Sequence, residues 1–82
     1  MSVKDLLEQS MNAHKAAASA RNQRRPDARA LLETAHRLRL EALALDPSRT
    51  DPAWSSEQVH TVSTADTHDS LMAFYEKQLA KP

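Results

Sequence analysis

Apolar residues recur every three or four positions between Asp27 and Asp46, the spacing that places them on one face of an α-helix. The members of this face are Ala28, Leu31, Ala35, Leu38, Ala42 and Leu45. The opposite side carries charges that alternate in sign every four residues, as is typical of a solvated helix face: Arg29, Glu33, Arg37 and Glu41. Pro26 suits the first turn of a helix, and Pro47 cannot continue one. The pattern therefore predicts a helix over about 27–46.

A second stripe of largely apolar positions lies near the start of the chain. Its members are Val3, Leu7, Met11, His14 and Ala18. Ser2 is suited to cap this helix, and the acidic Asp5 follows three residues later. We predict a helix over about 3–23, followed by a short polar turn, and a short turn makes neighbouring helices antiparallel. Residues whose numbers sum to about 50 should then meet across the hairpin, as Met11 and Leu38 would.

Residues 47–66 change character, because two prolines and many Ser and Thr residues replace the helical period. We predict an irregular connector there, with Trp54 as its apolar anchor. A shorter helix is predicted over about 67–80, and its apolar face is formed by Leu71, Met72, Tyr75 and Leu79, with Phe74 on the edge. A helix this short is marginal alone in water, so it must dock. The sequence leaves open whether it docks on its own hairpin or on a second chain.

Composition limits the core that these helices can build. The chain has 82 residues and no net charge; fourteen residues are Leu, Val or Phe, and fourteen others are Ala. A domain of this size buries only about 60% of the surface of its unfolded chain, and its large core side chains are few. We therefore expect a single all-α domain over 1–82 that completes its core by self-association, most simply as a homodimer.

The residue types that are missing narrow the possible functions. The chain has no Cys for a disulfide or thiolate site, and no Gly for a phosphate-binding loop or dinucleotide fingerprint. No apolar run approaches the roughly 18 residues of a membrane span, so we expect a soluble, cytoplasmic protein. We expect no cofactor and no enzymatic activity, because the candidate acidic and serine groups fall in connector or terminal segments without an organised base.

The four histidines are His14, His36, His60 and His68, and none is spaced four residues from another or has a Cys partner. We therefore expect no metal site. His14 differs from the others because it lies within the apolar stripe of the first helix, where it is expected to be buried. Burial disfavours the protonated imidazole, so acidification is expected to loosen the assembly.

Two surfaces are candidates for binding a partner. The apolar stripe of the helix over 27–46 is wider than the first helix can cover, so its uncovered part is the expected interface, completed by the connector and the C-terminal helix. The expected interface residues are Leu32, Leu40, Leu43, Trp54, Leu71, Met72, Phe74, Tyr75 and Leu79. The second candidate is a basic patch at the hairpin tip, formed by Arg21, Arg24, Arg25 and Arg29, whose simplest interpretation is a solvated turn.

Residues 35–47, AHRLRLEALALDP, resemble the second helix of a tetratricopeptide repeat. The residues that carry the resemblance are Ala35, Ala42, Leu43, Leu45, Asp46 and Pro47. Arg39 stands where that family has an aromatic residue, Pro26 ends the preceding helix earlier than the repeat would, and there is no second copy. The resemblance implies a helical hairpin and not peptide binding. The Ala- and Arg-rich, Ile-free composition also looks like that of a small bacterial or bacteriophage accessory protein.

These patterns together predict a non-enzymatic helical module for protein–protein interaction or assembly, which self-associates. The alternative is a small accessory factor that binds nucleic acid or a transcription regulator through the basic hairpin tip. No motif names the partner.

Overall fold

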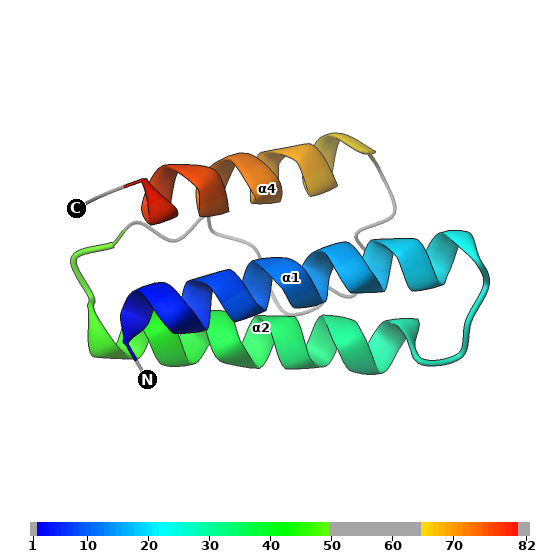
Figure 1. Ribbon diagram of the computed structural model, residues 1–82, viewed down its shortest axis with the longest axis horizontal. Coiled ribbons are helices and arrows are strands. Elements are labelled where there is room, and N and C mark those ends of the chain that lie inside the picture. Colours follow the sequence, from blue (N-terminus) through cyan, green and yellow to red (C-terminus); the bar gives the residue numbers. More distant parts are fainter. Residues whose placement is uncertain (1, 50–64, 81–82) are drawn as a thin grey trace.

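The computed structural model describes residues 2–49 and 65–80, with side chains described for 2–49 and 69–80. The described residues form three α-helices: α1 (Val3–Asn22), α2 (Ala28–Leu45) and α4 (Ala65–Leu79). The predicted all-α fold, an antiparallel helical hairpin with a shorter C-terminal helix, is confirmed (Figure 1).

The hairpin helices begin and end within one residue of the predicted bounds, 3–23 and 27–46. The C-terminal helix begins at Ala65, before the predicted start near 67. The connector predicted over 47–66, with Trp54, falls mostly outside the described residues.

The start of α1 has the predicted cap. The Ser2 Oγ accepts a hydrogen bond from the backbone N–H of Asp5 at 3.2 Å, which satisfies one of the N–H groups that have no partner within the helix. The start of α2 is built differently. The Asp27 side chain makes no capping bond and instead accepts a hydrogen bond from Arg25 Nη2 at 2.6 Å, so the turn is held by an ion pair between its own residues.

The end of α1 is a Schellman motif without glycine. The N–H of Arg25 donates to the carbonyl of Ala20 at 2.8 Å, and the N–H of Arg24 donates to the carbonyl of Arg21 at 2.9 Å. Arg24 itself has a φ of 55°, in the left-handed region that glycine usually occupies at this position. The chain therefore reverses direction through a strained arginine.

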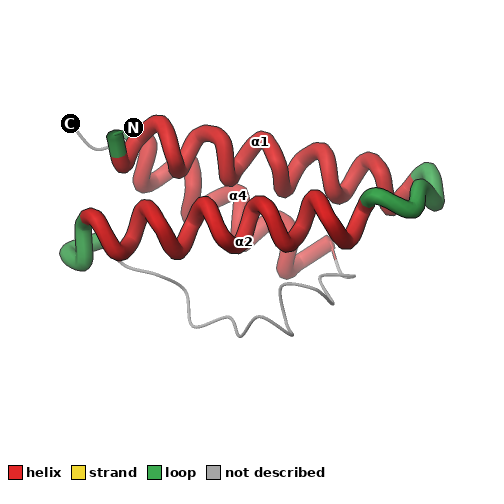
Figure 2. The backbone as a smooth tube through the Cα atoms, turned by 90° about the horizontal axis from the view of Figure 1, so that it is seen from below, coloured by secondary structure: helices red, strands yellow, loops and turns green. Residues whose placement is uncertain are grey.

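The three helices are arranged around α1. Figure 1 shows α4 above α1 and α2 below it, and the view turned by 90° in Figure 2 shows α1 and α2 side by side with α4 behind them. The helix α1 runs antiparallel to both of the others, and it packs against both. The backbones of α2 and α4 do not approach each other closely over the described residues.

The core combines leucines and alanines of the hairpin with large residues of α4. One buried cluster contains Leu6, Leu7, Ala42, Leu71, Phe74 and Tyr75, and the partly buried residues packed against it are Val3, Met11, Leu38, Met72 and Leu79. Each buried aromatic residue removes roughly 150–250 Å² from water, more than the alanines of the hairpin can supply. The C-terminal helix therefore docks on the hairpin of its own chain, and Met11 and Leu38, which the predicted register pairs, both pack against this cluster.

Candidate functional site

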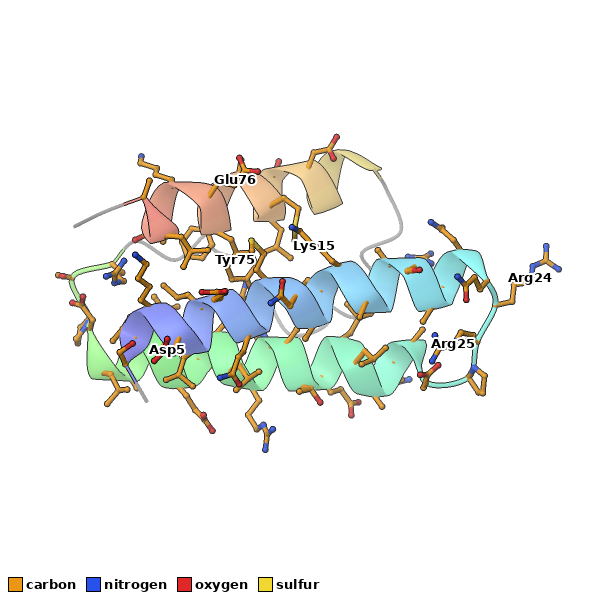
Figure 3. All side chains as sticks on the ribbon, in the orientation of Figure 1. Asp5, Lys15, Arg24, Arg25, Tyr75 and Glu76 are labelled. Atoms are coloured by element: carbon orange, nitrogen blue, oxygen red, sulfur yellow. The ribbon has the colours of Figure 1, made fainter. Side chains whose placement is uncertain are left out.

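A buried polar node joins the three helices. The Oγ of Ser10 in α1 lies 2.6 Å from the carbonyl oxygen of Ala35 in α2 and 2.5 Å from the Oη of Tyr75 in α4. A serine hydroxyl has one proton and a carbonyl can only accept, so Ser10 donates to Ala35 and accepts from Tyr75. Both hydrogen bonds of Ser10 therefore have a defined donor and a defined acceptor. Figure 3 shows Tyr75 reaching from α4 towards the hairpin.

His14 lies beside this node and is 2% exposed. Its ring centroid is 5.6 Å from that of Tyr75 at an interplanar angle of 43°, and Phe74 makes an edge contact with Tyr75 at 5.5 Å. Such tilted and edge-on pairs are favourable arrangements of aromatic rings. The structure therefore places His14 in the core, while its sensitivity to acid stays a prediction.

Arg39 is the largest fully buried side chain among the described residues. Its Nη2 lies 3.0 Å from the Nδ1 of His36, one turn earlier on α2. A guanidinium can only donate, so Nδ1 of His36 accepts and the imidazole proton sits on Nε2. Sequence reasoning missed the burial of Arg39, although it lies four residues after Ala35 and three before Ala42, on the apolar face.

A clamp at the end of α2 ties this helix to α4. Arg49 Nε donates to Asp46 Oδ2 at 3.1 Å, and Arg49 Nη1 donates to the backbone carbonyl of Gln78 at 2.9 Å. That carbonyl belongs to the last turn of α4, where a cation also interacts favourably with the helix dipole. The clamp connects α2 and α4 at their C-terminal ends, although their backbones stay apart.

The carboxylate of Asp46 organises the clamp. The Ser48 hydroxyl donates to Asp46 Oδ1 at 2.5 Å, and the backbone N–H of Ser48 donates to the same oxygen at 3.2 Å. The Ser48 hydroxyl bond, together with the Ser48 backbone bond and Arg49, holds the pKa of Asp46 below its ordinary value of 3.8, although partial desolvation acts to raise it. Asp46 therefore stays ionised and available to Arg49 at neutral pH.

The side of α2 that points away from α1 is open to solvent. We call it the outward face of α2, and its residues, all exposed, are Arg29, Ala30, Glu33, Arg37, Leu40, Glu41 and Ala44. Leu40 is 48% exposed within this face, and Leu45, at its flank, is 62% exposed. An ion pair on this face joins Arg29 Nε to Glu33 Oε1 at 3.4 Å, and the face carries both signs of charge.

No protein-family model matches this chain, and comparison with curated proteins and with solved structures finds no significant match.

Most of the expected interface residues are used inside the chain. Leu71, Phe74 and Tyr75 are buried, and Met72 and Leu79 pack partly buried against the same cluster. Leu32, expected on the uncovered part of the stripe, is only 9% exposed, and Leu43 is half-buried. Leu40 is exposed as an interface residue must be, and Trp54 lies outside the described residues.

The expected basic patch is exposed at the hairpin tip, and Figure 3 shows Arg24 pointing away from the rest of the molecule. Arg25 is paired with Asp27 and Arg29 with Glu33, so acidic neighbours offset part of the positive charge. Arg21 and Arg24 complete the patch at the end of α1.

The residues that the structure describes form no metal site and no membrane-spanning helix. A shallow hollow on α1 is lined by Asp5, Glu8, Gln9 and Asn12, which all belong to one exposed helix face. The described histidine and acidic residues form no group of three that could share a metal ion. No described helix is long and apolar enough to cross a membrane. The outward face of α2 is therefore the candidate interaction surface.

Proposed function

We propose that this chain is a non-enzymatic protein–protein interaction module that self-associates through the outward face of α2. The exposure of Leu40 carries the proposal. The other large apolar side chains described on α2 are buried or half-buried except Leu45, whereas Leu40 stands within a face that no described helix covers. A second helix laid along this face would remove Leu40 from water.

The size of the face predicts a weak association. Burying a leucine completely contributes about 1.5–3 kcal/mol, so burying the exposed half of Leu40 contributes about 1 kcal/mol in each copy. Stable complexes usually bury about 1,200–2,000 Å² in total, which is more than one pair of short helix faces supplies. We therefore expect a dissociation constant on the order of 0.1 mM, typical of a transient assembly.

Sedimentation over a range of protein concentrations tests the proposal. The wild-type protein is expected to show a mass that rises with concentration, whereas Leu40→Lys is expected to stay monomeric. Leu45→Lys is the matched control, because it places the same charge on the same helix at a position outside the outward face, and it should associate like the wild type. Both variants should keep the helical circular dichroism of the wild type, because each site is exposed and lysine is a good helix former.

Two results would overturn the proposal. One is a wild-type chain that stays monomeric up to millimolar concentration. The other is a Leu40→Lys variant that associates as well as the wild type, since the surface used would then lie elsewhere.

The alternative function, binding of nucleic acid or a transcription regulator at the basic patch, has weaker support. The ion pairs of Arg25 with Asp27 and of Arg29 with Glu33 reduce the number of cations that could release counterions from a phosphate backbone.

A further inference from the structure

We propose that the outward face of α2 binds the α2 helix of a second copy. The two helices run antiparallel, and the two-fold axis that relates them lies level with residue 35. This inference rests on the proposed function and adds the identity, direction and register of the partner. A closed two-fold dimer requires a self-complementary surface, because the same patch serves both copies. The charges of the outward face meet this requirement in one register.

The charge order along the face decides between the possible pairings. Arg29, Glu33, Arg37 and Glu41 alternate in sign and are all exposed. In a parallel dimer in register, each charge lies level with its own copy, so every pairing is between like charges. In an antiparallel pair whose opposing residue numbers sum to 70, each cation lies level with an anion. Arg37 then lies level with Glu33 of the second copy, and Arg29 with Glu41 of the second copy.

Neighbouring antiparallel registers are less favourable. A shift by one helical turn places Arg37 level with Arg37 of the second copy, or Glu33 level with Glu33, so like charges meet. A shift by two turns restores opposite charges but keeps only two of the four pairs. Like charges placed opposite each other are penalised and opposite ones favoured, so the charges act mainly by selecting the register.

The apolar residues of the face fit the same register. Leu40 lies level with Ala30 of the second copy, whose small side chain leaves room for a close approach of the two helices. The pairs of Arg37 with Glu33 of the second copy lie nearest the axis, because their residue numbers are closest to 35. These two symmetry-related pairs are therefore the ones to test.

Charge reversal gives a direct test by sedimentation at low salt. Arg37→Glu alone places two glutamates opposite each other near the axis, and Glu33→Arg alone places two arginines there. Each variant is expected to self-associate about ten-fold more weakly than the wild type, since two exposed pairs change from attraction to repulsion. An equimolar mixture of the two variants pairs Glu with Arg at both central positions, so it should associate within about three-fold of the wild type.

The mixture separates interchain from intrachain effects. Each variant loses the favourable spacing of Glu33 and Arg37 within its own helix, and this loss persists in the mixture. Recovery on mixing therefore reports contacts between chains. The double variant Glu33→Arg with Arg37→Glu should also self-associate like the wild type, and circular dichroism should show that every variant keeps its helices.

The possible outcomes distinguish the two proposals. A wild-type protein that does not associate at any concentration refutes both proposals. A wild type that associates while the mixture does not recover overturns the register and leaves the proposed function standing. Recovery of Arg37→Glu by Glu41→Arg in place of Glu33→Arg would overturn it too, because it selects a register displaced by two turns.

Discussion

Replacing Tyr75 by Phe removes one hydroxyl from the buried node between the three helices. Tyr75 is fully buried, and its Oη donates to Ser10 Oγ at 2.5 Å. A buried hydrogen bond contributes about 0.5–1.5 kcal/mol net, and the ring of Phe keeps the apolar contacts of Tyr. Tyr75→Phe is therefore expected to lower the free energy of unfolding by about 1 kcal/mol, which lowers Tm by about 4–8 °C for a domain of this size.

A double-mutant cycle with Ser10 tests the geometry of the node. Ser10→Ala removes the bonds to both Tyr75 and Ala35, which costs about 2 kcal/mol, offset by about 0.5 kcal/mol from the better helix propensity of alanine. In the Ser10→Ala background the hydroxyl of Tyr75 has lost its Ser10 acceptor, so Tyr75→Phe should then cost less than it does in the wild type. The coupling free energy between the two substitutions is expected to be about 1 kcal/mol.

Urea denaturation followed by circular dichroism measures the wild type and the three variants of the cycle at one fixed, low protein concentration, because self-association would raise the apparent stability. Ser19→Ala is the matched control: it lies on the same helix but is exposed, so it should change stability by no more than about 0.5 kcal/mol. Additive effects of the two substitutions would refute the node, as would a Tyr75→Phe variant as stable as the wild type.

Two further predictions concern the turn and the response to acid. Arg24→Gly should stabilise the protein by about 1 kcal/mol in the same denaturation assay, because glycine adopts the φ of 55° without strain. Arg25→Gly is the control and should not stabilise the protein, because Arg25 does not have a positive φ. A loss of stability in Arg24→Gly would contradict the assignment of strain. Asp46 has a lowered pKa in the folded state, so its contribution is present above the ordinary pKa of 3.8 and is lost as the pH falls through the folded value. Asp46→Asn should therefore flatten the dependence of stability on pH below about 4, and a profile identical to the wild type there would reject the clamp. His14→Ala tests the remaining acid response between about pH 5 and 8, and an unfolding midpoint that does not change with pH in either protein would reject a role for His14.

The apolar spacing of the sequence was enough to predict the helices, because it reports directly which face of each helix avoids water. The hairpin bounds and the cap at Ser2 followed from local signals. The prediction did not single out Ser10 and Arg39, although Ser10 lies three residues after Leu7 and Arg39 lies four residues after Ala35. Whether a polar side chain there is buried depends on partners from other helices, and spacing does not reveal them.

Other features depend on contacts far apart in the sequence. The Arg49 clamp joins residues separated by 29 positions, and no periodic pattern marks it. The docking side of α4 was also open, since its apolar face would suit its own hairpin or a second chain equally well. The left-handed turn at Arg24 gave no signal, because the residue that usually marks such a turn, glycine, is absent from the chain.

The central place of α1 has a consequence for the order in which the chain folds. The node bond from Ser10 to Ala35 spans 25 positions, whereas the bond from Tyr75 to Ser10 spans 65. Closing the longer loop costs about 0.8 kcal/mol more chain entropy, and α4 has only the exposed side of an existing hairpin on which to nucleate. We therefore expect the hairpin to form early during folding. The helix α4 should dock on it last and should be the first helix to undock. Each departure of α4 admits water to Ser10 and His14, so the amide hydrogens of α4 should exchange with solvent faster than those of α1.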